Sequence, residues 1–160
     1  MAAEYSANAV QTVAVNAPVV FTESPVPCSR GIIFHRDESG IFRLANNATT
    51  NVCGCGCGCR KVYESLYAVT FHGNIAISEG GMAGPIQLSV SIDGEPDPSS
   101  TMIVTPAAVG DFQNVGAEII VAVPSICGCE SISVRNTSTQ AIDVQNANLT
   151  INYLGLRRVL

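Results

Sequence analysis

The stretch Ile86-Gln87-Leu88-Ser89-Val90-Ser91-Ile92-Asp93-Gly94 decides the fold of this chain. Its apolar residues alternate strictly with polar ones, a pattern typical of a β-strand that buries one face. The dipeptide Asp93-Gly94 then ends the strand with a two-residue turn signal. The stretch 67–77 repeats the pattern, with Tyr67, Val69 and Phe71 on one face and polar residues on the other. Both stretches predict half-buried strands.

Working outward, the same two-residue period continues along almost the whole chain. Further strands are predicted at 13–15, 19–21, 32–34, 41–44, 119–123, 132–134, 142–144 and 147–153. About ten short strands with turn signals about every 8–12 residues predict an all-β fold, an antiparallel sandwich or jelly roll. The length is that of one domain. We expect an N-terminal arm at 1–8, a single jelly-roll domain at 9–156 with a Cys-rich insertion at 46–62, and a C-terminal tail at 157–160.

The composition limits the possible partners. Hydrophobic residues make up 47% of the chain and charged residues only 13%, a low share for a free monomer, so we expect other subunits to cover much of the surface. The net charge is −5 and Lys61 is the single lysine, which argues against nucleic acid as a partner. The apolar stretches are strand-sized, too short for a membrane span. Residues 1–5 lack the pattern of a secretory signal, so we expect synthesis in the cytoplasm.

Six of the seven cysteines fall in two Gly-interrupted clusters, and Cys28 stands apart. The first cluster is Cys53, Cys55, Cys57 and Cys59, and the second is Cys127 and Cys129. In an extended strand, alternate thiols lie about 6.6–7 Å apart on one face, at the outer limit for a disulfide, so bonds to another strand are easier. The glycines would also let the run fold back on itself. These seven residues are therefore the disulfide candidates, with Cys28 as the expected leftover or intersubunit thiol.

Two other interpretations of the clusters remain open. Cys53, Cys55, Cys57, Cys59, Cys127 and Cys129 could supply four sulfurs to a tetrahedral zinc ion, although one residue between paired ligands is an unusual spacing. The thiols could also stay reduced. The favoured interpretation, disulfide cross-links, requires no cofactor. His35 and His72 are isolated on strands and the serines lack a nucleophile motif, so we expect no enzyme activity.

The ordered series of strands resembles the tumour necrosis factor-like jelly rolls, a group that includes complement globular heads and heads of spore-surface proteins. The segments that carry the likeness are 19–21, 40–44, 67–76, 86–94 and 147–151. More specifically, 5–13 and 100–107 resemble small Cys-rich proteins encoded by phages and prophages of gut Firmicutes. The resemblance implies a TNF-like homotrimer at a virion surface, among other virion or surface-assembly proteins. No Gly-X-Y collagen stalk precedes the head.

With this resemblance, we expect a non-enzymatic structural protein, a trimeric component of a bacteriophage virion surface such as a head (capsid) decoration or fibre protein. Two alternatives remain open. One is an extracellular bacterial filament or spore-surface subunit joined by disulfides. The other is a thiol-rich metal-binding module.

Overall fold

A computed structural model describes residues 1–28, 31–36, 38–48, 62–124 and 128–159. They form twelve strands and one 3₁₀ turn, η1 (Pro98–Ser100). The strands are β1 (Ala2–Ala7), β2 (Gln11–Val13), β3 (Glu23–Val26), β4 (Ile33–His35), β5 (Phe42–Ala45), β6 (Val62–Ile77), β7 (Ile86–Ile92), β8 (Glu95–Pro96), β9 (Met102–Val104), β10 (Gln113–Pro124), β11 (Cys129–Asn136) and β12 (Ile142–Val159).

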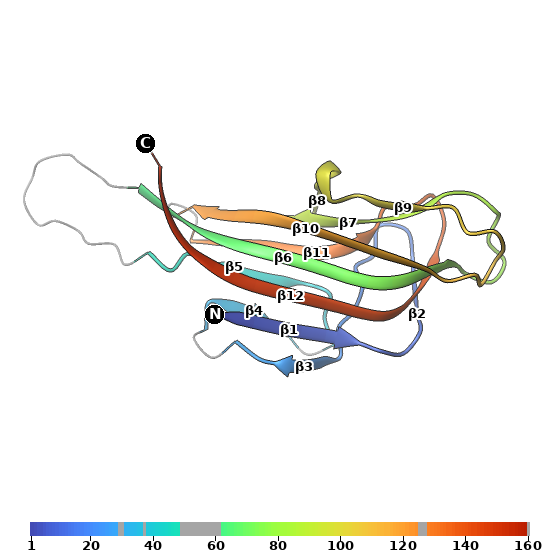
Figure 1. The fold of residues 1–160 in the computed structure, drawn as a ribbon, viewed down its shortest axis with the longest axis horizontal. Helices are drawn as coiled ribbons and strands as arrows, with labels where there is room; N and C mark the ends of the chain where they lie inside the picture. The colour runs from blue at the N-terminus through green and yellow to red at the C-terminus, as the bar shows by residue number, and fades with distance from the viewer. Residues whose placement is uncertain (29–30, 37, 49–61, 125–127, 160) are drawn as a thin grey trace, which may run out of the picture.

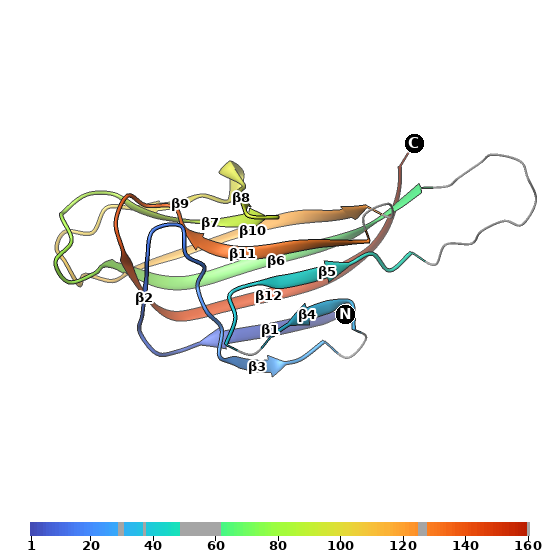
Figure 2. The same ribbon diagram turned by 180° about the vertical axis from the view of Figure 1, so that it is seen from behind.

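The strands form two antiparallel sheets that pack face to face (Figure 1). Sheet A has the order β10-β6-β12-β1-β3, with β2 also paired to β12. Sheet B has the order β4-β5-β11-β7-β8, with β9 also paired to β7, and it faces the viewer in Figure 2. Most neighbouring strands within a sheet are distant in sequence, and from β5 to β12 the chain crosses repeatedly between the sheets, which is the topology of a jelly roll. The predicted fold class is confirmed.

The core lies between the sheets and follows the alternation read from the sequence. Tyr67, Val69 and Phe71 on β6 are fully buried, as are Ile86, Leu88 and Val90 on β7. Asp93 and Gly94 both have positive φ, 49° and 88°, as a two-residue hairpin turn between β7 and β8 requires. Because the side chains of a strand alternate between faces, these patterns leave the other faces of both sheets for solvent or partners.

Both ends of the chain differ from the expected arm and tail. Residues 1–8, expected as an arm, contain β1, which pairs with β12 from Ala2↔Asn152 to Ala7↔Ala147. Residues 157–160, expected as a tail, begin with the end of β12, which stays paired to β6 as far as Val159↔Val62. Tyr5 of β1 is almost fully buried. The alternation around it depends on alanines, whose small side chains give a weak hydrophobic signal.

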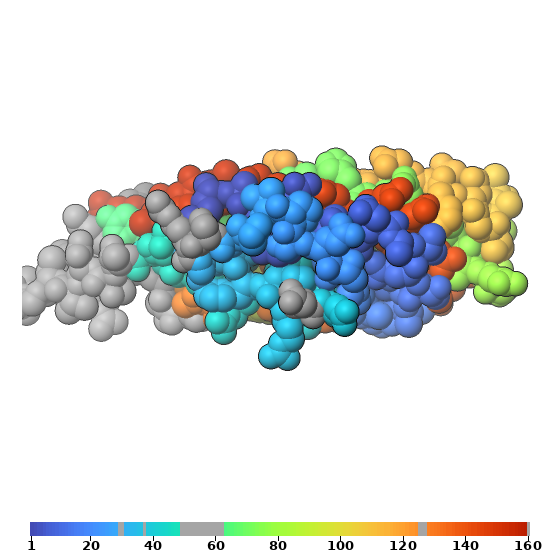
Figure 3. All heavy atoms as spheres, turned by 90° about the horizontal axis from the view of Figure 1, so that it is seen from below, coloured from blue at the N-terminus to red at the C-terminus, as the bar shows by residue number. Residues whose placement is uncertain are grey.

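The strands predicted at 32–34 and 41–44 are confirmed as β4 and β5, which pair as a hairpin at one edge of sheet B. Phe34 pairs with Arg43, and His35 pairs with Phe42. The His35 and Phe42 rings stack with centroids 4.3 Å apart, and Tyr5 packs on both. This cluster joins the edges of the two sheets. Figure 3 shows the N-terminal segments in dark blue beside the hairpin in light blue and cyan.

No helix in the described part of the chain has the length and apolar character needed to cross a membrane.

Candidate functional site

The structure offers three candidate functional sites. The first is the end of the sandwich next to the cysteine clusters, the second is the outer face of sheet A, and the third is a hollow on the β4–β5 hairpin. Most predicted site residues fall outside the described part of the chain: Cys53, Cys55, Cys57, Cys59 and Cys127. Cys129 is described and exposed at the start of β11. Cys28 is half-buried, with its Sγ 3.5 Å from the Met1 Sδ.

The described flanks of the two cysteine clusters lie side by side. Ala45 ends β5 and precedes the first cluster, and Cys129 belongs to the second cluster. Ala45 and Cys129 pair with each other across sheet B. One residue further on, the Asn46 N–H donates to the Gly128 carbonyl oxygen at 2.8 Å. Both clusters therefore leave the sandwich from the same end of sheet B.

Asn46 holds this junction together through its side chain. The Asn46 Nδ2 donates to the carbonyl oxygens of Val123 on β10, at 2.6 Å, and Tyr63 on β6, at 3.2 Å. Its Oδ1 accepts from the Ala48 N–H at 2.7 Å. One amide thus joins the end of β5 in sheet B to two strands of sheet A, and it satisfies backbone groups where the sandwich ends.

Tyr67 adds a second link beneath this junction. Its hydroxyl donates to the Ala45 carbonyl oxygen. Burial is the main cause that raises the pKa of this phenol, so it keeps its proton and remains a donor at neutral pH. The first cysteine cluster therefore follows a well-anchored strand end.

A carboxyl pair lies beside Cys129. Asp93 Oδ1 accepts from the Ser131 N–H at 2.8 Å and from its hydroxyl at 2.9 Å. Glu130 shares a hydrogen bond with Asp93, which raises the pKa of Glu130 to about 7, while the same bond lowers the pKa of Asp93. As the pH falls below about 7, the pair therefore takes up about one proton. Its position couples the β7–β8 turn to the start of β11.

The outer face of sheet A carries an apolar patch near the same end of the sandwich. The central row runs through Asn152, Ala68 and Ile120, which are paired across β12, β6 and β10. In the next row, Leu66 pairs with Ala122, and Leu154 is exposed at a bulge of β12. We call Leu66, Ala68, Ile120, Ala122 and Leu154 the apolar patch; Ile120 and Leu154 are exposed, Leu66 and Ala122 are half-buried, and Ala68 is almost covered by its neighbours.

Farther along the same face the rows become polar and carry two carboxylates, Glu4 and Glu118. Thr70 pairs with Thr150 on one side and Glu118 on the other, and its hydroxyl donates to Glu118 Oε2 at 3.1 Å. Glu4 accepts from the Asn148 side chain at 2.7 Å. Both carboxylates are thus already hydrogen-bonded within the sheet. The neutral donors leave both carboxylates charged, and on the other side of the apolar patch Glu64 forms an ion pair with Arg157.

The outer face of sheet B differs in its charge. Arg43 on β5 and Arg135 on β11 lie on this face, beside serines of β11. Its most exposed large apolar residue is Ile103 on β9, 60% exposed, compared with 54% for Ile120 on sheet A. Ile120 interrupts the apolar–polar alternation of β10. That interruption was the available sequence signal for the apolar patch, which sequence reasoning missed.

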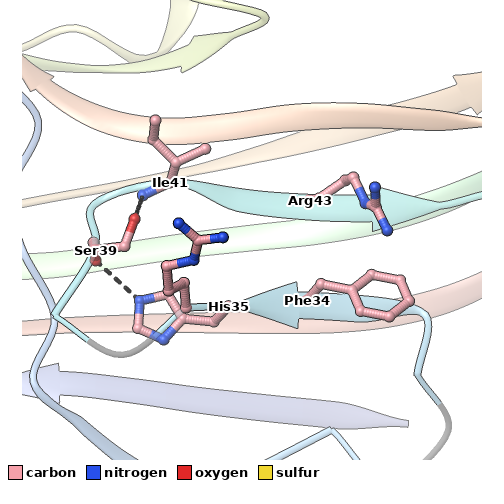
Figure 4. A pocket seen from close by; sticks show the side chains of 6 residues that line it. Phe34, His35, Ser39, Ile41 and Arg43 are labelled. Carbon is pink, nitrogen blue, oxygen red and sulfur yellow. Dashed lines mark hydrogen bonds between the residues drawn. The ribbon is translucent and has the colours of Figure 1, made fainter.

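A hollow of about 360 Å³ lies on the β4–β5 hairpin and was also missed from the sequence (Figure 4). Its lining residues are Phe34, His35, Arg36, Ser39, Ile41 and Arg43. Sequence reasoning placed His35 on a strand, as the structure does. It did not use the register of the hairpin, which sets Phe34 beside Arg43.

Metal ligation is not visible in the described ranges, where no three His, Cys, Asp or Glu side chains are grouped to hold an ion. The metal interpretation of the clusters concerns residues outside those ranges, apart from Cys129.

No protein-family model matches the chain, and no curated protein sequence matches it. Several solved structures are similar in shape. Pika GITRL has 14% identity and a TM-score of 0.46 over 96% of each chain. A CBM35 from Cellvibrio japonicus Abf62 has 11% identity and a TM-score of 0.37, covering 100% of this chain and 99% of the other.

A family 35 carbohydrate binding module from Clostridium thermocellum has 14% identity and a TM-score of 0.33, covering 91% of this chain and 90% of that one. The jelly-roll assignment rests on the strand order described above.

Proposed function

We propose that the protein is a non-enzymatic structural subunit that assembles into a homotrimer through the outer face of sheet A. The observation that carries the proposal is the apolar patch of Leu66, Ala68, Ile120, Ala122 and Leu154, in which Ile120 is 54% and Leu154 55% exposed. A surface of this kind loses little electrostatic hydration when a partner covers it.

A second copy of the chain is the occupant that best fits this face. The whole chain has a low share of charged residues, 13%, and a net charge of −5. The same face repeated around a closed symmetry axis would bury apolar surface against apolar surface. Two standard interfaces of about 800 Å² each would use roughly a fifth of the subunit's 8668 Å².

The setting that we propose is a virion surface, with the trimer as a head decoration or fibre protein. Support comes from the resemblance of 5–13 and 100–107 to phage-encoded proteins. The cysteine clusters leave the sandwich at the end that carries the apolar patch. Oxidation after release could then cross-link that end, which would stabilise the particle without an active site.

The junction at Asn46 also favours a second candidate, a disulfide-joined extracellular filament or spore-surface subunit. The flanks of both clusters meet at one exposed end of the sandwich, where bonds could form between subunits as easily as within one. Gel electrophoresis of air-oxidised protein without reductant separates the two settings. A ladder of covalent multimers supports the filament, and a band at the subunit mass supports the decoration protein. Native mass measurements test the trimer itself, as described in the Discussion.

A further inference from the structure

We propose that the hollow on the β4–β5 hairpin binds an acidic saccharide through a carboxylate or sulfate group. Two guanidinium groups, Arg36 and Arg43, line it on a chain whose net charge is −5. Neither arginine forms an ion pair with a described carboxylate; the ion pair in those ranges joins Arg157 to Glu64. The hollow therefore offers two guanidinium groups that form no ion pair with the described carboxylates.

Arg43 is held in place without losing its charge. Its guanidinium carbon lies 4.7 Å from the centroid of the Phe34 ring, its cross-strand neighbour (Figure 4). A cation–π contact orients a guanidinium while leaving its N–H donors available. These donors form a planar fork that matches the two oxygens of a carboxylate or sulfate. The geometry is that of a preformed anion contact.

The rest of the hollow is fixed by hydrogen bonds within the hairpin. The His35 Nε2 lies 2.9 Å from the Ser39 carbonyl oxygen, and the ring stacks on Phe42. The Ile41 N–H donates to the Ser39 hydroxyl oxygen at 3.1 Å, and the Phe21 N–H donates to the Ser39 carbonyl oxygen at 3.2 Å. A site whose groups are already ordered loses less entropy when a ligand binds.

The chemistry of the walls favours a saccharide over a simple ion. Ile41 and Phe34 are 49% and 42% exposed, so they offer apolar surface beside the two cations. A sugar ring has an apolar face of C–H groups and carries hydroxyls that Ser39 or His35 could bind. An inorganic anion would use the guanidinium groups and leave the apolar walls exposed. The open hollow also suits a residue within a longer glycan chain.

Isothermal titration calorimetry with the full-length protein tests the proposal. The probes are a uronic-acid tetrasaccharide, its sulfated form, a neutral tetrasaccharide, sodium sulfate, sodium acetate and an oligoglutamate peptide. We expect binding of at least one acidic tetrasaccharide, with the carboxylated and sulfated forms showing which anion is preferred. Binding of neither acidic form, equal binding of the neutral form, binding of the simple ions alone, or equal or tighter binding of the acidic peptide would overturn the proposal.

Matched arginine substitutions locate the site. Arg36→Gln and Arg43→Gln should each weaken binding about tenfold or more, because each removes a charge-assisted contact. Arg43→Lys should also weaken it, since lysine keeps the charge but lacks the planar fork. Arg158→Gln, an exposed arginine at the far end of β12, removes the same charge elsewhere. If Arg158→Gln weakens binding as much as Arg43→Gln does, the attraction is unspecific and the assignment to this hollow is wrong.

Discussion

The side chain of Asn46 donates a hydrogen bond of 2.6 Å to the carbonyl oxygen of Val123, and this contact joins the two sheets where the cysteine clusters begin. The same amide donates to Tyr63, so its loss would leave two carbonyl oxygens with one partner fewer. We expect Asn46→Ala to lower the free energy of unfolding by about 1–3 kcal/mol. Urea denaturation followed by circular dichroism measures the change.

Asn47→Ala is the matched control for that substitution. The side chain of Asn47 is exposed. Its backbone N–H donates a hydrogen bond to the Ser65 hydroxyl oxygen, and the substitution leaves this bond in place. The control should stay within about 0.5 kcal/mol of the unmodified protein. Equal stability of Asn46→Ala and Asn47→Ala would show that the amide does not hold the junction.

The carboxyl pair of Asp93 and Glu130 predicts a pH dependence of stability. The folded pKa of Glu130, about 7, exceeds its unfolded value of 4.5. The stabilisation from its proton is therefore complete below pH 4.5 and is lost as the pH rises through 7. The pKa of Asp93 is lowered, so its contribution to stability depends on pH in the opposite direction. That contribution changes only near and below pH 3.8, the ordinary pKa of the group. Between pH 5 and 8, Glu130 decides the trend.

Glu130→Gln should remove that trend, because glutamine donates to Asp93 at every pH. We expect the variant to match the unmodified protein at pH 5 and to be more stable at pH 8. The pair is largely accessible to solvent, so the gain should be about 1 kcal/mol or less. Thermal melts at the two pH values provide the measurement. A variant that is less stable than the unmodified protein at pH 8 would contradict a shared proton.

The adjacent flanks of the cysteine clusters support the prediction that at least one disulfide joins them. The bond would link Cys127 or Cys129 to Cys53, Cys55, Cys57 or Cys59 and close a loop of about 70 residues, for which the chain-entropy model gives roughly 4–5 kcal/mol. Peptide mapping of oxidised protein identifies it directly. Bonds found only within 53–59, or seven thiols that all alkylate after air exposure, would rule it out.

A double substitution provides the stability control for this bond. Reductant should lower the melting temperature of the unmodified protein and have a smaller effect on Cys127→Ser/Cys129→Ser, which lacks the second cluster. An equal effect of reductant on both proteins would place the stabilising bond elsewhere.

The sequence predicts the strands whose alternation involves large apolar residues and leaves the others unclear. The stretches 67–77 and 86–92 are evident because Tyr67, Phe71 and Leu88 bury large side chains. The strand β1 escapes detection because two of its buried positions are Ala3 and Ala7. Its partner β12 lies about 140 residues away, and no local pattern specifies a pairing of that range.

The candidate sites show the same limit. The cysteine clusters are conspicuous in the sequence, but their common exit depends on the pairing of Ala45 with Cys129. Arg43 meets Phe34 through the register of one hairpin, and the apolar patch assembles Leu66, Ile120 and Leu154 from three strands. Each of these surfaces exists only after its strands have paired in the correct register.

Native mass is the most direct test of assembly through the outer face of sheet A. Sedimentation equilibrium or light scattering of reduced protein at micromolar concentration should give about 50 kDa, three times the 16.7 kDa chain. Ile120→Glu should shift the mass to that of a folded monomer, whereas Ile103→Glu, at a similarly exposed position on the opposite sheet, should leave the trimer intact. A monomer for the unmodified protein, or a trimer that survives Ile120→Glu but not Ile103→Glu, would contradict the account.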